Sequence, residues 1–570
     1  MSPKQRRTRG LAGGGITITT ARLGAALEEW RRHLGSPFVI TDQAALASAG
    51  TATYATSQRI PAILRPGSRE DVQTCVRIAN RYGVPLYPVS TGKNWGYGST
   101  VPLTDGCVLV ELTRLNRIVD FDEQLGYLTV EPGVTFQQAF DYLRRRSSKL
   151  LLSASGASPD ASLIGQTVER GLGVGRLADR LASTCGFEVI LPTGECVRTG
   201  FERFPSAAAA KVHRWGLGPH LDGLFTQSNL GIVTQMTFWL QPCPERIQVV
   251  YFGLNDEAGF DRLVDGLQRQ AMHGLLTPAL TLFNDFRFFA AQEQYPWEAV
   301  GGQPLRPNLL RLLIRQAAPF GVPLGAWQGD VAFFAHSEDE ARVHLQLLEH
   351  ELRPLVDSWT VVEASQPELL DLLKRGAEPA AVTGADSPLR GMLLRKYLGV
   401  PQSGGLRQLY WRKRVPAPAD IDPHRDRCGV IWMSPVVPFA SPHVRAAVDA
   451  VTIATLDAGF EPAITLQCVS ERHVVLITSL HYDREIPGED ERAADWHRDL
   501  AGRLRESGYY PYRQSTLALA QSGEGSGAYE ELLRTLKRAL DPNDILAPGR
   551  YIDIAPALER RDQSDFHGRQ

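Results

Sequence analysis

The sequence predicts an α+β protein of at least two domains, and three observations lead to this fold class. The chain has 570 residues, more than one hydrophobic core usually organises. Residues 60–245 alternate short β-rich runs with helical patterns, whereas residues 246–505 carry longer amphipathic helices and proline-rich connectors. We therefore expect a disordered N-terminus over 1–20, a first domain over 21–245, a second over 246–505 and a C-terminal segment over 506–570.

The helices and strands of the first domain are predicted from hydrophobic periodicity and from the residues that mark turns. A helix is predicted over 70–82, and a second over 135–146 after a Glu-Pro-Gly turn at 131–133. Runs rich in β-branched and apolar residues predict the strands 108–112, 128–130, 187–191 and 231–240.

The second domain has its own sheet in this interpretation. A helix is predicted over 338–352, and apolar runs predict strands over 430–435 and 473–477. A last helix over about 527–540 precedes an Asp-Pro-Asn-Asp turn that begins at 541.

Composition excludes several classes of protein. With 43% apolar residues, 22% charged residues and a formal net charge of −2, nothing indicates a nucleic-acid or membrane surface. No apolar stretch reaches the roughly 18–20 residues that span a bilayer, and the basic run 4–9 lacks the apolar region of a signal peptide. The seven cysteines show no CxxC spacing and no zinc constellation. We expect a cytoplasmic protein with reduced thiols and no metal.

A glycine-rich loop at 87–98, Tyr-Pro-Val-Ser-Thr-Gly-Lys-Asn-Trp-Gly-Tyr-Gly, is the strongest local signal. It follows a predicted helix and a short apolar strand. Glycine permits positive φ and close approach of backbone N–H groups to a ligand. Such groups form a nest for an anion, for example a dinucleotide pyrophosphate, although an ordinary turn fits this loop equally well. The Gly-Leu-Gly-Val-Gly run at 171–175 is not a Rossmann fingerprint, because it follows a helical pattern and its last glycine is misplaced.

Several motifs in order resemble the vanillyl-alcohol oxidase and p-cresol methylhydroxylase family of flavoproteins. They are Arg-Pro at 65–66 ahead of 70–72, the loop 92–98, and the segments 130–135, 168–173, 221–234, 512–513 and 541–549. The resemblance implies an FAD domain built from both chain ends, with an α+β cap domain between them over the flavin.

The resemblance also assigns cofactor residues. The loop would hold the pyrophosphate through Ser90, Thr91, Gly92, Lys93, Asn94, Gly96, Tyr97 and Gly98. The other residues expected around FAD are Glu169, Gly173, Asp179, Gly231, Ile232, Val233 and Arg550.

Relatives bind a para-substituted phenol as its phenolate through two tyrosines and an arginine. Tyr97, Tyr512 and Arg513 fall on those positions and are the expected catalytic residues. A free phenol has a pKa near 10, and a guanidinium with two hydroxyl donors would favour its anion. The phenolate then makes the benzylic carbon a hydride donor to flavin N5 and becomes a p-quinone methide.

The chain departs from the family at three places. Val174 replaces a third tyrosine, and Ala157 stands where the oxidase has an active-site aspartate, with Asp160 close in sequence. Val430 occupies the position of a flavin-linking histidine, and Tyr410 is only a weak candidate for a tyrosine link. We therefore expect non-covalent FAD.

The missing aspartate favours desaturation or oxidative decarboxylation of a tyrosine-derived phenol over hydroxylation. Decarboxylation needs a cation to position the carboxylate, and Arg176, Arg180 and the run 412–414 are candidates. Two alternatives stay open: an FAD-dependent oxidase or dehydrogenase of a sugar, aldonolactone or hydroxy acid, and an inactive flavin-binding protein. Molecular oxygen or a redox protein would re-oxidise the flavin, and the resemblance implies a homodimer.

Overall fold

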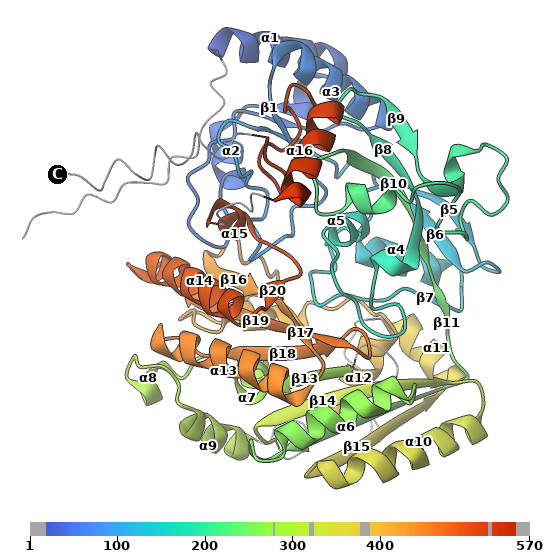
Figure 1. The fold of residues 1–570 in the computed structure, drawn as a ribbon, viewed down its shortest axis with the longest axis vertical. Helices are drawn as coiled ribbons and strands as arrows, with labels where there is room; N and C mark the ends of the chain where they lie inside the picture. The colour runs from blue at the N-terminus through green and yellow to red at the C-terminus, as the bar shows by residue number, and fades with distance from the viewer. Residues whose placement is uncertain (1–18, 277–279, 318–323, 377–387, 522–526, 555–570) are drawn as a thin grey trace, which may run out of the picture.

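The computed structural model describes residues 19–276, 280–317, 324–376, 388–521 and 527–554. The predicted disordered N-terminus falls almost entirely outside the described residues, and helix α1 begins at Thr20. Helices occur together with one mixed sheet and several antiparallel sheets, so the α+β prediction is confirmed (Figure 1).

A small mixed sheet and two helices form the first layer. Its strand order is β1 (Val39–Ile40), β2 (Ile63–Leu64), β4 (Val108–Glu111) and β3 (Leu86–Val89), with β3 parallel to β4. Helices α1 (Thr20–Leu34) and α3 (Arg69–Tyr82) share one hydrophobic cluster with these strands. Ser68 caps the start of α3 through its side chain, and Gly83 ends the helix in the left-handed conformation.

A five-stranded antiparallel sheet follows along the chain. Its order is β5 (Ile118–Asp122), β6 (Tyr127–Val130), β10 (Ile232–Trp239), β8 (Thr184–Ile190) and β9 (Cys196–Arg198). Helices α4 (Phe136–Arg145) and α5 (Leu163–Val168) pack in the same hydrophobic cluster as this sheet. A separate short pair joins β7 (Leu150–Leu151) to β11 (Gln241–Pro242).

A nine-stranded sheet dominates the remainder of the described chain. Its order is β15 (Ser358–Ser365), β12 (Arg246–Leu254), β14 (Trp327–Ala335), β13 (Leu280–Asn284), β18 (Ala463–Cys468), β19 (His473–Asp483), β17 (Pro435–Pro438) and β20 (Tyr510–Pro511), with β16 (Cys428–Met433) also paired to β19.

Long amphipathic helices cover the nine-stranded sheet (Figure 1). They are α6 (Phe260–Met272), α10 (Glu338–Leu352), α13 (Ser441–Asp457) and α14 (Glu489–Glu506). Shorter helices complete the described fold: α2 (Gln43–Ala49), α7 (Asp285–Gln292), α8 (Trp297–Val300), α9 (Pro307–Ala317), α11 (Gln366–Arg375), α12 (Pro388–Tyr397), α15 (Thr516–Gln521) and α16 (Ala528–Leu540).

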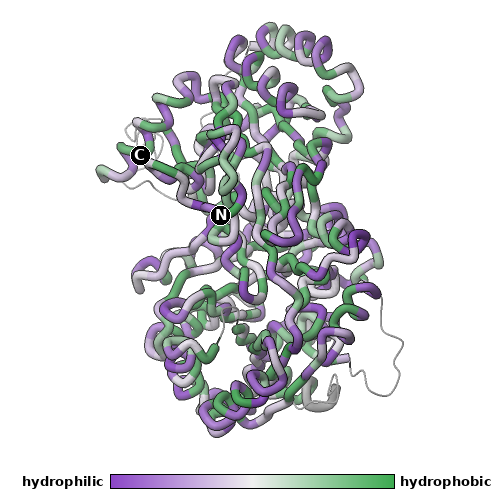
Figure 2. The backbone as a smooth tube through the Cα atoms, turned by 90° about the vertical axis from the view of Figure 1, so that its right-hand side faces the viewer, coloured by the Kyte–Doolittle hydropathy of each residue, from purple (hydrophilic) through white to green (hydrophobic). Residues whose placement is uncertain are grey.

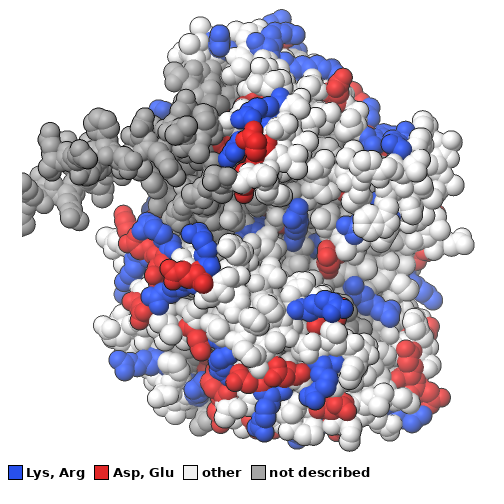
Figure 3. All heavy atoms as spheres, viewed as in Figure 1, with Lys and Arg blue, Asp and Glu red and all other residues white. Residues whose placement is uncertain are grey.

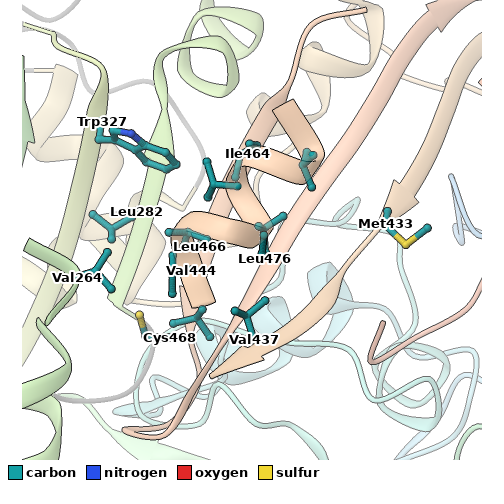
Figure 4. Close-up of a cluster of buried hydrophobic side chains, with 14 of the residues drawn as sticks. Val264, Leu282, Trp327, Met433, Val437, Val444, Ile464, Leu466, Cys468 and Leu476 are labelled. Atoms are coloured by element: carbon teal, nitrogen blue, oxygen red, sulfur yellow. The ribbon is translucent and has the colours of Figure 1, made fainter. Parts of the chain in front are cut away.

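The core beneath these helices is built from strands far apart in sequence. Figure 4 shows Trp327 and Leu282 on one side and Leu466, Leu476 and Val444 on the other. Each of these side chains is almost fully buried, and each large one stabilises the fold by about 1.5–3 kcal/mol through burial.

The C-terminal segment returns to the first layer (Figure 1). The backbone N–H of Leu86 donates to the Ile545 carbonyl at 2.6 Å, and Leu546 forms a parallel bridge with Leu86. Lys537 of α16 is fully buried, and its ammonium donates to Asp541 at 2.6 Å and to the Asn229 carbonyl at 3.1 Å. The domain boundaries near 245 and 505 stay predictions.

The distribution of charge and hydropathy is that of an ordinary globular protein. On the face in Figure 3, basic and acidic side chains are interspersed, and the tube in Figure 2 alternates hydrophilic and hydrophobic residues along most elements. Among the described residues, no helix has both the length and the apolar character needed to cross a membrane. The seven cysteines are all free thiols, as predicted, and six are buried.

Candidate active site

A cavity of about 450 Å³ is lined by residues 87–174 of the N-terminal part of the chain and by residues of the nine-stranded sheet. One side comes from residues 87–95 and from segments between 155 and 174, and the other from β13, β16, β18, β19 and residues 405–409. Tyr512, Arg513 and Arg550 of the C-terminal segment complete the wall. The volume is typical of a small-molecule site.

The glycine-rich loop forms a cradle along this wall. Gly92, Gly96 and Gly98 all have positive φ, at 70°, 77° and 122°. A Cβ on Gly96 would lie 2.0 Å from Cδ1 of Trp432, so only glycine fits there. The backbone N–H groups of residues 91–94 donate to no other described residue. This leaves a row of donors at the cavity wall, which suits an anionic ligand.

Glu169 holds an ion-pair cluster at the cavity. Its carboxylate accepts a hydrogen bond from Arg550, a second from the Tyr551 hydroxyl at 2.9 Å, and lies 3.4 Å from Nε of Arg513. Burial acts to raise the pKa of Glu169, but attraction to Arg550 and Arg513 outweighs it and holds this pKa below its ordinary value. Two guanidinium groups against one carboxylate leave the cluster with one net positive charge.

The predicted phenol-binding residues meet at this cluster. The guanidinium carbon of Arg513 lies 4.2 Å from the ring centroid of Tyr97, and Nη2 of Arg513 donates to Oδ1 of Asn94 at 2.5 Å. The Tyr97 hydroxyl lies 3.3 Å from Oγ of Ser434. Burial raises the pKa of both Tyr97 and Tyr512, although Arg513 opposes the effect. Both hydroxyls are therefore neutral donors at physiological pH.

Some of the predicted cofactor residues line the cavity, and others do not. Those on the wall are Ser90, Thr91, Gly92, Lys93, Asn94, Tyr97, Glu169 and Arg550. Those not on the wall are Gly96, Gly98, Gly173, Asp179, Gly231, Ile232 and Val233. Asp179 accepts from the Ala182 backbone N–H at 2.9 Å, whereas Ile232 and Val233 belong to hydrophobic clusters.

The departures from the family pattern, together with Tyr410, fall in two environments. Ala157 and Val174 both line the cavity, but Asp160 is exposed and does not. Tyr410 is buried away from the cavity wall, and its hydroxyl donates to Oδ2 of Asp426 at 2.5 Å. Val430 is fully buried in the same small cluster as Tyr410. Covalent attachment through Tyr410 would require breaking these contacts.

The cationic candidates from the sequence do not reach the cavity wall. Arg412 lies 3.5 Å from a carboxylate oxygen of Glu461, and Lys413 pairs with Asp483 at 2.8 Å. Arg176 lies over the ring of Phe334.

Arg180 and Arg414, the remaining cationic candidates, do not line the cavity either, although Nε and Nη2 of Arg180 have no hydrogen-bond partner among the described residues. Arg180 is buried over the ring of Phe136, and Arg414 lies over Trp297.

Sequence reasoning missed Arg287, Lys396 and Gln467, which do line the cavity. No sequence signal marks these residues, because they are far apart along the chain. Arg287 lies in α7, Lys396 in α12 and Gln467 in β18, and only the fold brings these elements together.

The residues present fit FAD. The cradle supplies backbone donors suited to a pyrophosphate. Five buried side-chain polar atoms on cavity residues have no hydrogen-bond partner among the described residues: Oγ of Ser99, Oε1 of Gln166, Oε1 of Gln408, Nε of Arg513 and Nη1 of Arg550. Such atoms are costly when left unpaired, so they indicate a polar ligand.

Comparison with known proteins agrees with this reading. Residues 60–200 match the model of the FAD binding domain family. The chain is 44% identical over 539 residues to 1'-carboxy-chondrochloren decarboxylase of Chondromyces crocatus, covering 94% of this chain and 98% of that protein. It is 28% identical over 552 residues to the flavoprotein subunit of 4-cresol dehydrogenase (hydroxylating) of Pseudomonas putida, covering 94% and 96%. The crystal structure of p-cresol methylhydroxylase with substrate bound superposes with a TM-score of 0.83 at 26% identity, covering 94% and 98%.

Proposed function

Since the chain belongs to the vanillyl-alcohol oxidase and p-cresol methylhydroxylase family of FAD-dependent oxidoreductases, we propose that it oxidises a para-substituted phenol at the benzylic carbon. The phenol is a tyrosine-derived natural product in this proposal. The observation that carries it is the group of Tyr97, Tyr512 and Arg513 at one end of the cavity. Bound FAD supplies a two-electron acceptor for the benzylic hydride.

Arg513 and the two tyrosines would bind the phenol as its anion. Their cluster with Glu169 and Arg550 carries one net positive charge, and a nearby opposite charge favours the ionised form of an acid. The neutral hydroxyls of Tyr97 and Tyr512 add two donors for the phenolate oxygen. The ionised ring pushes electrons toward the benzylic carbon, which becomes the better hydride donor and leaves a p-quinone methide.

The fate of the quinone methide depends on which acids and bases face it. Among the described residues, Glu169 is the one carboxylate on the cavity wall, and its ion pairs occupy it. The wall has no described histidine or aspartate, and Ala157 adds neither charge nor donor there. No side chain is therefore placed to activate water, which supports desaturation or oxidative decarboxylation over hydroxylation. The name of the decarboxylase relative supports the same outcome.

Product analysis tests the proposal. The holoenzyme is mixed anaerobically with a 3-(4-hydroxyphenyl)propanoate-type acid, flavin absorption is followed, and products are separated by mass. We expect bleaching of the flavin, release of CO2 and a 4-vinylphenol. A product that keeps the carboxylate and gains a hydroxyl would refute the proposed product type.

The alternative substrates make a different prediction. A sugar, aldonolactone or hydroxy acid does not need the two tyrosyl hydroxyls, so Tyr97→Phe and Tyr512→Phe variants would keep full activity on it. An inactive flavin-binding protein would show no bleaching with any of these compounds. We propose non-covalent FAD, re-oxidation by molecular oxygen or a redox protein, a cytoplasmic location and a homodimer.

A further inference from the structure

The cations on the cavity wall differ in whether they have a counter-ion. Those among the described residues are Lys93, Arg287, Lys396, Arg513 and Arg550. Lys396 lies 2.5 Å from Oδ1 of the buried Asp330, and Lys93 lies 3.5 Å from Asp422. Arg513 and Arg550 share Glu169. Four of the five are therefore at least partly neutralised by a carboxylate.

Arg287 is the exception among the described cations of the cavity wall. No described carboxylate lies within ion-pair distance of it, and Nη1 donates to the neutral Oγ of Ser479 at 2.7 Å. Its guanidinium lies 5.3 Å from the ring centroid of Trp432. Burial lowers the pKa of Arg287 to about 10, with no carboxylate raising it. A half-buried guanidinium on the cavity wall with no described carboxylate beside it is suited to an anionic ligand.

Strand geometry relates Arg287 to the phenol-binding end. Trp432, whose ring lies against Arg287, is in β16, and Ser434, beside the Tyr97 hydroxyl, is two residues after Trp432 and directly follows the strand. Residues i and i+2 of an extended chain share one face and lie about 7 Å apart. Arg287 and the Tyr97 hydroxyl therefore contact side chains two residues apart on one extended segment, and both Arg287 and Tyr97 line the same cavity.

We propose that Arg287 binds the substrate carboxylate and so makes the enzyme selective for para-substituted phenols with a carboxylate on the carbon next to the benzylic one. This inference rests on the proposed function. The phenolate end meets Arg513, and the carboxylate end meets Arg287. None of the cations suggested by the sequence lines the cavity, so Arg287 takes the role expected of them.

The proposed reaction balances with this placement. The benzylic hydrogen leaves with its electron pair to bound FAD, and the phenolate becomes a p-quinone methide. The bond to the carboxylate carbon then breaks, CO2 leaves, and its electron pair forms the side-chain double bond while the ring regains the phenolate. Oxygen or a redox protein takes the two electrons from the reduced cofactor. Arg287 holds the carboxylate and transfers no proton.

A pair of ligands that cannot be oxidised separates binding from chemistry. In 4-hydroxyphenoxyacetate an ether oxygen replaces the benzylic carbon, and 4-ethoxyphenol is its counterpart without the carboxylate. Binding to the holoenzyme is followed through the change in flavin absorption. We expect Arg287→Met to weaken the binding of 4-hydroxyphenoxyacetate by about 10- to 100-fold, the range for a charged hydrogen bond. We expect the same variant to weaken the binding of 4-ethoxyphenol by less than about threefold.

Two further variants control the comparison. Arg287→Lys keeps the charge and is expected to recover part of the selectivity. Arg498→Met removes an exposed arginine that pairs with Asp495 on α14 and is expected to change neither affinity. Equal weakening of both ligands in Arg287→Met, or no weakening of either, overturns the inference.

The outcomes also separate this inference from the proposed function. If the wild-type holoenzyme binds neither ligand and no para-alkylphenol bleaches its flavin, the proposed function fails, and the inference fails with it. If 4-propylphenol bleaches the flavin but selectivity for the carboxylate is the same with and without Arg287, only the inference fails.

Discussion

Replacing Arg513 by methionine tests how the site ionises its substrate. The variant leaves Glu169 paired with Arg550 and Tyr551, so the buried carboxylate keeps a counter-ion while the cluster loses its net positive charge. Arg513 lies 4.2 Å from the Tyr97 ring centroid, which puts a phenol bound beside Tyr97 within about 4–6 Å. An opposite charge at that range lowers an acid's pKa by about 1–3 units, or about 1.4–4 kcal/mol.

The assay is an ultraviolet difference titration of bound 4-ethoxyphenol between pH 6 and 10. In the wild type we expect the ligand to ionise about 1–3 units below the free phenol, and in Arg513→Met close to it. Burial raises the pKa of Tyr97 and Tyr512, so these groups stay neutral over most of the range. Arg498→Met is the matched control. An identical ligand pKa in wild type and Arg513→Met would refute the reasoning.

Four further predictions concern stability and the cofactor. Glu169→Gln leaves Arg513 and Arg550 without a counter-ion, and we expect a loss of about 3–5 kcal/mol, measured by urea unfolding; an unchanged midpoint would contradict this. In the wild type, the ionised Glu169 stabilises the folded state fully above pH 4.5, its pKa in the unfolded chain. This stabilisation is lost as the pH falls through the lower pKa that Glu169 has in the folded state. Burial lowers the pKa of His481 from 6.5 to about 3, so the folded state resists protonation and the wild type loses about 2 kcal/mol between pH 8 and 5. His481→Phe should flatten that dependence, and an equal slope would count against it. Gly92→Ala forces a side chain at φ 70° and puts Cβ 2.7 Å from Cγ2 of Thr100, so we expect weaker FAD retention on gel filtration, with Gly404→Ala, where Cβ meets open space, as control. Tyr410→Phe should not change the flavin released by acid precipitation; flavin that stays with the wild-type protein alone would show a covalent link.

Local signals explain why most elements were predictable. The helix expected over 70–82 is Arg69–Tyr82, because Ser68 and Gly83 mark its two ends by well-defined capping chemistry. The helix expected over 338–352 is Glu338–Leu352, with Ser337 as its side-chain cap. The strand expected over 473–477 continues to Asp483, since its extension pairs with β16, a contact that local sequence does not encode.

The site was predictable where function constrains a continuous segment. The loop 87–98 and the adjacent pair Tyr512–Arg513 reach one cavity, although more than 400 residues separate them. Asp179 and Ile232 were expected beside the cofactor, but a turn and a hydrophobic cluster account for their side chains. A motif marks the segment that approaches a ligand, whereas the direction of each side chain depends on packing.

Charge partners explain why Arg287, the arginine proposed to bind the carboxylate, could not be identified from the sequence. The run 412–414 is conspicuous because its three cations are consecutive, yet Arg412 and Lys413 face Glu461 and Asp483, which lie 49 and 70 residues away. Arg287 stands alone in an aromatic run typical of a core helix. Among the described cations of the cavity wall it is distinguished by the absence of a counter-ion, and that property depends on which strands lie beside it. A sequence shows where cations are, whereas only the fold shows which of them still needs an anion.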